Sequence, residues 1–514
     1  MVDLRKPLND ENVMQSAPAS ERWILAATIL GSSMAFIDGT VVNVALPALQ
    51  KTYNATVVDV QWVVEAYALF LAALLLTGGS MGDRFGRRRV FCCGVALFGL
   101  ASLGCGLAQS IGQLIGARAL QGIGGALLVP GSLAIIGASF SEARRGRAIG
   151  TWSGFTAITT AIGPVMGGWL IENVSWRVAF FINLPIAAAV LWISFFHVPE
   201  SRNEDLDNHL DWSGAALATL GLGLLVYGLI ESSRLGFGHS LVLASLTGGV
   251  LLLAVFLAVE ARSSHPMLPL ALFRSRYFTG ANLLTLFLYA ALGGGMFFVP
   301  LNLIQVQDYS ATAAGAVWLP FIFIMFVLSR WSGGLVARYG ARLPLVAGSG
   351  LAALGYGLFI VPGVGGSYWT TFFPAVALLG LGLAVCVPSL TTTVMNALGA
   401  NQPGVASGVN NAVSRVAGLL GIALLGIVML QAFNGELDRR LTAIEIAPEV
   451  RRAIDGQRGR LAGIELPENL DAVKRAALIE AIDQSFVVGF RVVMTVSFAL
   501  TLLSALSAWM IIEK

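Results

Sequence analysis

Charged residues are scarce in this chain of 514 residues, of which only 12% are Asp, Glu, Lys or Arg and 56% are hydrophobic. A soluble domain carries about 25% charged residues. The chain therefore has too few charges to cover a water-facing surface, and most of its surface must face lipid. The net charge is only +3, which gives no reason to expect nucleic acid as a partner.

Cysteine and histidine are also rare, at four residues each. The cysteines lie inside apolar runs without metal-ligand spacing to histidine, so we expect core residues, no disulfide, no metal and no other cofactor. The nucleotide-binding pattern G-x-x-x-x-G-K-[ST] is absent, which argues against an ATP-driven pump. We find no cluster of residues in the sequence that would indicate a catalytic site. The polar first 22 residues are not followed by a cleavable apolar leader, so we expect no cleaved signal peptide.

Long apolar runs are what the chain has in abundance, and runs of about 20 residues mark membrane-spanning helices. We therefore predict an all-α integral membrane protein with fourteen spans. They lie near 23–47, 57–79, 90–108, 112–137, 148–170, 178–198, 212–231, 240–260, 278–302, 311–331, 343–362, 370–393, 405–431 and 486–511.

Arginine marks one side of the predicted membrane protein. The short loops on the side of the N-terminus are rich in arginine, whereas the opposite short loops hold little beyond Lys51, Arg177 and Arg234. Short loops rich in lysine and arginine normally face the cytoplasm. We therefore expect a multi-pass protein of the inner or plasma membrane with both termini in the cytoplasm.

The sequence also repeats itself in order, at nearly one offset. Gly79–Arg88 returns as Gly333–Arg342, and Gly122–Pro130 returns as Gly380–Pro388. Gly150 and Gly163 return as Gly408 and Gly421. Such a repeat predicts two parallel halves of six helices. The predicted parts are a cytoplasmic tail 1–22, a first half 23–198, a linker 199–277 with the seventh and eighth helices, and a second half 278–514.

The second half contains a long insertion, 432–485, that has no run able to span the membrane. Its charged residues alternate with spaced apolar ones, and Pro448 and Asn469 mark helix starts. We expect short amphipathic helices outside the cytoplasm. A solvated cap is the favoured interpretation, and recruitment of a substrate or partner is the alternative.

Ionisable residues inside predicted spans are costly and are functional candidates by default. Asp38, Glu65 and Arg118 each lie roughly 10–14 Å below the outer surface at 1.5 Å per helical residue. Burial favours the protonated form of a carboxyl group, whereas a nearby arginine favours its charged form. A carboxylate that moves between these two surroundings could therefore load and release a proton. A static ion pair is the alternative, and Glu65 could instead extend toward the outer surface.

The turn Gly79–Arg89, with the sequence GSMGDRFGRRR, is short, rich in glycine and strongly basic. It cannot cross a bilayer, so it must join two helices on the side that retains positive charge. It resembles the G-x-x-x-D-R-x-G-R-[KR] signature between helices 2 and 3 of the major facilitator superfamily. The resemblance implies a cytoplasmic gate made of Asp83, Arg84, Gly86, Arg87 and Arg88.

Other segments resemble the fourteen-helix drug:proton antiporters of that superfamily. Ile37–Pro47 is similar to their helix-1 signature, Leu114–Gly122 to their helix-4 motif with Arg118 at its arginine, and Trp176–Pro185 to a further segment. The fifth helix resembles the antiporter motif of exporters, although a purely structural glycine face is the alternative. The residues of this motif are Gly150, Gly154, Gly163, Pro164, Gly167 and Gly168.

This resemblance covers nearly the whole chain and is weakest in 432–485. It implies the major facilitator fold with two extra linker helices, and a proton-coupled exporter of amphipathic, cationic drugs or toxic small molecules. Asp38 would be the main protonation site, tuned by Arg118, with Glu65 as a second acid. Its partners would be the small-molecule substrate, protons and the bilayer, and we expect a monomer. Candidates for the substrate cavity are Phe36, Trp62, Tyr67, Trp152, Phe297, Trp318, Asn411 and Arg415.

Two departures from the family pattern limit this hypothesis. Ala337 stands in the repeated loop where Asp83 stands in the first, and no acid lies inside the helices of the second half. Two other functions stay open. A dedicated exporter of one metabolite, antibiotic or lipid would share these features. A receptor or scaffold that had lost transport would show no proton-linked flux.

Overall fold

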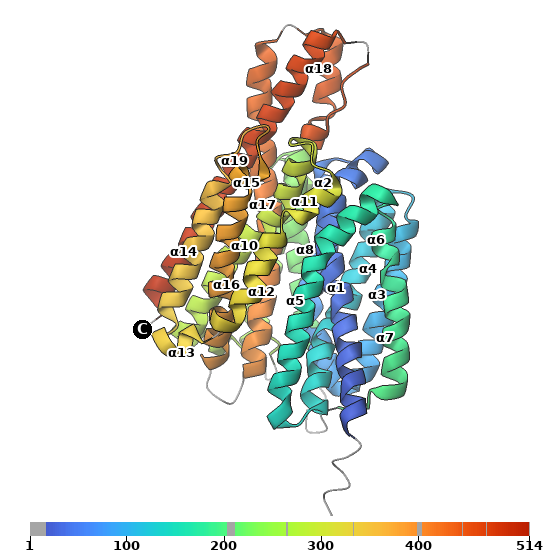
Figure 1. The fold of residues 1–514 in the computed structure, drawn as a ribbon, viewed down its shortest axis with the longest axis vertical. Coiled ribbons are helices and arrows are strands. Elements are labelled where there is room, and N and C mark those ends of the chain that lie inside the picture. The colour runs from blue at the N-terminus through green and yellow to red at the C-terminus, as the bar shows by residue number, and fades with distance from the viewer. Residues whose placement is uncertain are drawn as a thin grey trace, which may run out of the picture.

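The computed structural model describes residues 17–202, 211–263, 266–332, 334–397, 403–444, 446–468 and 470–512, and all regular structure in these ranges is helical (Figure 1). Most of the predicted tail 1–22 and of the link 199–211 lies outside them, as do Gly333 and Asn469. In Figure 1, α1 begins at the lower end of the bundle, and a helical projection rises from the upper end. These ends are called the lower and upper sides below.

The first six predicted spans form seven helices. A capping box between Thr56 and Asp59 begins α2, and Ser110 caps α4 by accepting from the Gln113 N–H. Gly86, at φ 109°, makes the tight turn from α2 to α3. The helices are α1 (Ala17–Tyr53), α2 (Val57–Phe85), α3 (Arg87–Leu107), α4 (Ile111–Ser139), α5 (Glu142–Asn173), α6 (Val178–Phe181) and α7 (Asn183–His197).

The remaining helices form the linker pair and the second half. The linker pair is α8 (Trp212–Leu235) and α9 (Ser240–Glu260), followed by the short helix η2 (Leu270–Arg274). The second half contains α10 (Arg276–Gln305), α11 (Ala311–Ala316), α12 (Leu319–Ser332), α13 (Leu335–Tyr339), α14 (Arg342–Leu358), α15 (Tyr368–Thr371), α16 (Phe373–Asn396), α17 (Pro403–Thr442), α18 (Pro448–Asp455), η4 (Arg458–Gly463) and α19 (Ala472–Ile511).

Three predicted spans are interrupted near their upper ends. The span 178–198 divides at Ile182 into α6 and α7, the span 311–331 divides after Ala316 into α11 and α12, and the span 370–393 divides at Phe372 into α15 and α16. Proline explains the breaks, because Pro185, Pro320 and Pro374 have no N–H to bond the carbonyl one turn earlier.

Among the described residues, thirteen segments are long and apolar enough to cross a membrane. The 17-residue helix α14 occupies the remaining predicted position, between α12 and α16 in the chain. The prediction of an all-helical membrane protein with about fourteen spans is therefore confirmed.

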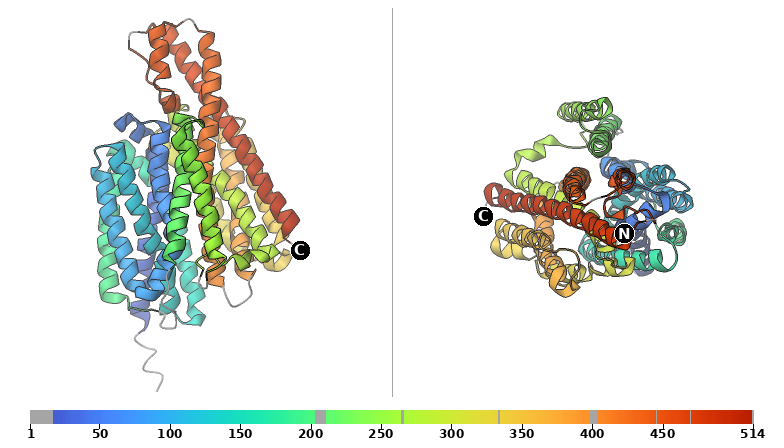
Figure 2. Two further views of the ribbon diagram at one scale, coloured as in Figure 1. Left: turned by 180° about the vertical axis from the view of Figure 1, so that it is seen from behind. Right: turned by 90° about the horizontal axis from the view of Figure 1, so that it is seen from above.

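The helices of the two predicted halves pack in the same pattern. In the first, α1 packs against α5 and α7, and α4 packs against α2 and α3. In the second, α10 packs against α17 and α19, and α16 packs against α12 and α14. The α8–α9 pair stands at the edge of the bundle, where α8 packs on α2 and α17 (Figure 2). These contacts agree with the repeat, while the domain boundaries stay a prediction.

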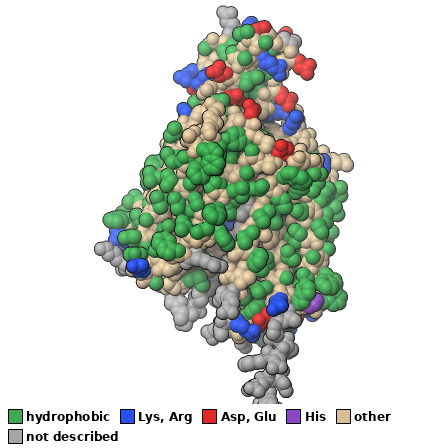
Figure 3. Space-filling model, viewed as in Figure 1, with side chains coloured by type: hydrophobic (Ala, Val, Ile, Leu, Met, Phe, Trp, Pro, Cys, Tyr) green, Lys and Arg blue, Asp and Glu red, His purple; other side chains and the backbone are tan. Residues whose placement is uncertain are grey.

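The upper projection belongs to the predicted insertion 432–485. It contains α18, η4, the end of α17 and the start of α19, and the last two are single helices of 40 residues that continue into the bundle. The second predicted helix is thus the beginning of a spanning helix, capped by Asp471. Charged side chains gather on the projection, whereas the sides of the bundle are largely hydrophobic (Figure 3).

Candidate functional site

A buried ion pair lies in the first half, between Asp38 of α1 and Arg118 of α4. Each side chain is only 1% exposed, and Nη1 of Arg118 donates a hydrogen bond to Oδ2 of Asp38. Nε of Arg118 also donates to the Val63 carbonyl oxygen at 3.0 Å. Its guanidinium lies 4.4 Å from the centroid of the Tyr67 ring. The predicted pairing of Asp38 with Arg118 therefore exists in the structure, although its role in transport stays a prediction.

Gln121 holds this pair in place and was not predicted as a site residue. Its Nε2 donates to Oδ1 of Asp38 at 2.9 Å and to Oγ of Ser102 at 2.8 Å, and its Oε1 accepts from Nη1 of Arg118 at 2.8 Å. Asn183 of α7 donates to the same Ser102 hydroxyl at 3.2 Å. The spacing of Arg118 and Gln121, three residues apart on one helix face, is the sequence signal that could have identified it.

Glu65, the second predicted acid, lies apart from the pair. It is fully buried in α2, and neither carboxylate oxygen has a hydrogen-bond partner among the described residues. No hydrogen bond or ion pair among the described residues joins it to Asp38 or Arg118. Gln61, one turn away on the same face of α2, donates to the Ile422 carbonyl of α17 at 3.2 Å. Glu65 therefore lies where α2 packs against the second half.

Asn411 and Arg415 lie one turn apart on α17. Asn411 is exposed and Arg415 is half-buried. Arg415 makes no hydrogen bond or ion pair with any described residue, and its buried Nε has no partner. Tyr67 of α2 and Tyr289 of α10 are close enough to interact with it electrostatically.

The basic turn between α2 and α3 is organised within the first half. Asp83 pairs with Arg87 at 2.8 Å, and Arg84 lies over the Phe85 ring. Glu200, which was not singled out from the sequence, accepts from the backbone N–H groups of Arg88 and Arg89 at 3.0 and 3.2 Å. Its charge thus lies at the N-terminus of α3, where the helix dipole favours an anion.

The predicted antiporter motif has a loosely packed lower part and a closely packed upper part in the structure. At Gly150 and Gly154, an added Cβ would meet nothing within 4 Å. At Gly163 it would lie 2.1 Å from the Thr40 Oγ1, and at Gly168 it would lie 2.3 Å from the Ala311 carbonyl oxygen. Gly167 is similarly tight against Val41, and the Pro164 carbonyl lies against Gly315. The upper part of the motif thus brings α5 into close contact with both α1 and α11.

Most predicted cavity aromatics have partners inside the protein. Nε1 of Trp62 donates to Glu231 of the linker helix α8 at 3.1 Å, and Nε1 of Trp152 donates to the Ser32 hydroxyl at 3.1 Å. Phe36 packs half-buried against the core of the first half. Phe297 and Trp318 are buried in the core of the second half. Tyr67 alone among them contacts the buried pair.

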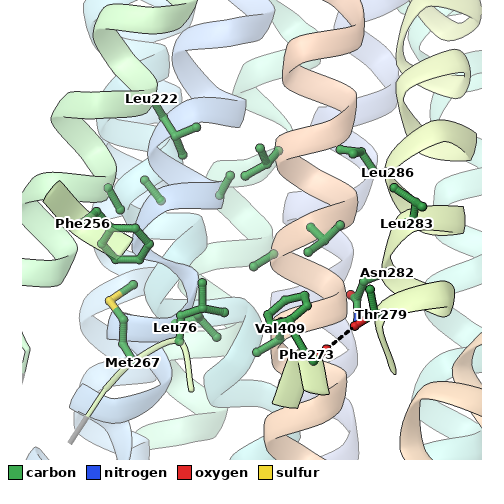
Figure 4. Close-up of a pocket in the computed structure, with 17 residues that line it drawn as sticks. Leu76, Leu222, Phe256, Met267, Phe273, Thr279, Asn282, Leu283, Leu286 and Val409 are labelled. Atoms are coloured by element: carbon green, nitrogen blue, oxygen red, sulfur yellow. Dashed lines mark hydrogen bonds between the residues drawn. The ribbon is translucent and has the colours of Figure 1, made fainter. Parts of the chain in front are cut away.

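An apolar cavity of ≈ 360 Å³ lies between α2, the linker pair, α10 and α17 (Figure 4). Leu76, Phe256, Met267 and Val409 point into it, and none of its lining residues is charged. At 3.6 residues per turn, Asn411 and Arg415 lie on the opposite face of α17. The cavity and the charged candidates are therefore separate features.

The two halves are joined on the upper side. Nε2 of Gln305 in α10 donates to Oε1 of Gln50 in α1 at 2.8 Å. Thr312 of α11 donates to Glu172 of α5. Arg460, in η4 of the projection, donates to Oδ1 of Asn54 in the turn between α1 and α2. The projection therefore contributes to the contact between the halves.

Comparison with known proteins gives one family. Residues 28–422 match the family described as the Major Facilitator Superfamily. The chain is 34% identical over 493 residues to the multidrug resistance protein Stp of Mycobacterium tuberculosis, covering 94% of this chain and 91% of that protein. It is 33% identical over 485 residues to the tetracenomycin C resistance and export protein of Streptomyces glaucescens, covering 94% and 90%.

Solved structures show the same fold at low sequence identity. A bacterial homologue of the human lysosomal transporter Spinster superposes with a TM-score of 0.64 at 18% identity, covering 95% of this chain and 98% of that chain. A peptide transporter bound to sulfate superposes with a TM-score of 0.60 at 14% identity, covering 91% and 94%.

Proposed function

The chain belongs to the Major Facilitator Superfamily of membrane transporters, and we propose that it exports amphipathic drugs or other toxic small molecules in exchange for protons. Family membership confirms the expectation of a transporter rather than an enzyme. Relatives that align over more than nine tenths of the chain are named as resistance and export proteins, which supports drug efflux as the direction and class of transport.

The buried pair of Asp38 and Arg118 is the observation that carries proton coupling. A charged pair inside a membrane protein is costly to bury, and it persists only when its hydrogen bonds are satisfied. Here Gln121 donates to the second carboxylate oxygen. A movement that separates Asp38 from Arg118 favours protonation, and re-pairing favours proton release. We propose Asp38 as the main protonation site, Arg118 as its regulator and Glu65 as a second acid.

Alternating access between the halves would supply that movement. The upper contacts of Gln305, Thr312 and Arg460 must break if the upper side opens. We propose that the turn containing Asp83, Arg84, Gly86, Arg87 and Arg88 then closes the lower side. In the present conformation, Asp83 pairs within its own half, with Arg87, and no described residue of the second half forms an ion pair with it.

The side on which arginine is concentrated supports an orientation. We propose that the lower side faces the cytoplasm, with both termini there, in the inner or plasma membrane. The proposed working unit is a monomer made of two six-helix halves, 23–198 and 278–514, with α8 and α9 in the linker 199–277. One proton entering through 100 mV would then supply about 2.3 kcal/mol.

The Asp38→Asn variant tests proton coupling. In proteoliposomes with an imposed pH gradient, the wild type should concentrate a cationic dye on the trans side and release protons when the dye is added. Asp38→Asn should lose both effects while it remains folded, because Asn keeps an acceptor for Arg118 but binds no proton. Glu480→Gln, an exposed acid of α19, is the control. Gradient-driven transport by Asp38→Asn at the wild-type rate would remove Asp38 from the mechanism.

A further inference from the structure

The guanidinium of Arg415 makes no hydrogen bond or ion pair with any described residue, and its buried Nε has no partner among them. Arg491 of α19 donates to the carbonyl oxygens of Val361 and Pro362, and Arg177 donates to those of Gly106 and Ala108. Arginine cannot lose its proton in a protein. The charge of Arg415 is therefore permanent and is left for water or for a ligand to satisfy.

The helix that carries Arg415 has one polar face and one apolar face. Val409, Val413 and Val416 line the apolar cavity beside the linker pair. Ser407, Asn411, Ser414 and Arg415 lie on the opposite face at 3.6 residues per turn. Asn411 and Ser414 satisfy only local backbone groups of α17, at 3.1 and 2.8 Å. A polar stripe within a membrane-spanning helix indicates a surface that faces water or a polar ligand.

The groups around Arg415 carry no compensating negative charge. Its electrostatic neighbours are the hydroxyl groups of Tyr67 and Tyr289, and no acid pairs with it among the described residues. Asp38 is bound to Arg118, and neither carboxylate oxygen of Glu65 has a hydrogen-bond partner among the described residues. The local field therefore favours an anion.

We propose that Arg415 binds an acidic group of the exported molecule, a carboxylate or a similar oxyanion, with Asn411 and Ser414 as neutral hydrogen-bonding groups beside it. The proposal rests on the export function proposed above and names a substrate class for it. A planar guanidinium can bind a carboxylate through two parallel hydrogen bonds. The substrates would then include amphipathic weak acids.

Tyr67 connects this site to the buried pair. Its ring lies 4.4 Å from the Arg118 guanidinium, and its hydroxyl interacts electrostatically with Asp38, Arg118 and Arg415. An anion at Arg415 would lie within electrostatic range of the side chain that packs on Arg118. Substrate binding and the state of the Asp38–Arg118 pair would therefore influence each other through one residue.

A matched pair of probes tests the proposal on the full-length protein in detergent. Binding of dansyl-labelled undecanoate and of its methyl ester is measured by fluorescence, and the ratio of the two Kd values cancels the general affinity of the chain for apolar molecules. The preference for the carboxylate should be at least about tenfold greater in the wild type than in Arg415→Gln, since a hydrogen bond to a charged group is worth more than one to a neutral group. Arg415→Lys should keep part of the preference.

Arg274→Gln removes the same charge from an exposed position in η2 and should leave the preference unchanged. Equal ratios in the wild type and Arg415→Gln would overturn the proposal, as would an equal loss in Arg274→Gln. If Arg415→Gln does not fold, Arg415→Met provides the same comparison.

Proton-driven export of a cationic dye is measured on the same preparations. Export without any carboxylate preference would overturn only the anion site. A carboxylate preference dependent on Arg415 without proton-driven export would support the site and overturn the proposed exporter.

Discussion

Two arginines inside this membrane protein have opposite surroundings. Arg118, in the first half, bonds to Asp38, Val63 and Gln121 and packs on Tyr67. Arg415, in the second half, has no hydrogen bond or ion pair with any described residue. The same side chain is thus built into the structure in one half and left open to a ligand in the other. The difference suggests that the first half handles the proton and the second contacts the cargo.

The strongest test of this comparison replaces each arginine with methionine. Arg118→Met leaves Asp38 in the interior without its cation, and breaking a buried pair in this way costs roughly 3–5 kcal/mol. Arg415→Met breaks no bond and should change the unfolding free energy by less than about 1 kcal/mol. Apparent thermal midpoints of the purified proteins in detergent measure both effects.

The double variant Asp38→Asn/Arg118→Met is the control for charge. It should be more stable than Arg118→Met alone, because no carboxylate is then left without its cation. Equal losses of stability for Arg118→Met and Arg415→Met would show that the two arginines are not held differently.

The sequence predicted the larger features because they depend on composition and chain-local patterns. Apolar runs identified the fourteen spans, and the order of motifs identified the family. The breaks at Ile182, after Ala316 and at Phe372 were missed, because an apolar run does not show where a helix is interrupted. The prolines that explain them, Pro185, Pro320 and Pro374, were visible in the sequence. The depth of Asp38 and Arg118 was correctly taken as a reason to pair them.

Depth alone could not show which way a side chain faces. Glu65 was placed in the layer of Asp38 and Arg118, but it forms no hydrogen bond or ion pair with either, and it lies one turn from Gln61, which bonds to α17. Trp62 was a cavity candidate, yet it bonds to Glu231 of the linker pair. Ser102 and Asn183 join the network of Gln121 from α3 and α7. Such contacts depend on how helices that are distant in the chain pack against each other. Motifs and helix depth in a single sequence do not show this packing.

Replacing Gln121 sharpens the comparison by weakening the surroundings of Asp38 without removing either charge. Gln121→Leu deletes the donor to Oδ1 of Asp38, and a hydrogen bond to a charged group is worth about 1.5–3 kcal/mol. Because this bond is made to the proposed proton-binding group, its loss should shift the pH dependence of export. Export measured in proteoliposomes over a range of pH tests the shift.

Gln61→Leu is the matched control for Gln121→Leu. Gln61 is equally buried, but its amide bonds to the Ile422 carbonyl rather than to an acid. It should change the rate without moving the pH profile. A uniform loss of rate by Gln121→Leu at every pH would mean that Gln121 does not act on Asp38.

The smallest expected effect concerns Glu65, whose carboxylate has no hydrogen-bond partner among the described residues. Because no bond is lost, Glu65→Gln should fold normally, and its consequences should appear only with charged cargo. Attraction between opposite charges strengthens where water is scarce, so a cation that reaches Glu65 when α2 and α17 separate would gain from the carboxylate. Export of a cationic dye should then fall several-fold more than export of a neutral compound. Both rates are compared in wild type, Glu65→Gln and Glu65→Asp, and the last variant should keep part of the difference. Equal losses for the two compounds would show that Glu65 supports the interface between α2 and α17 and takes no part in selecting charge.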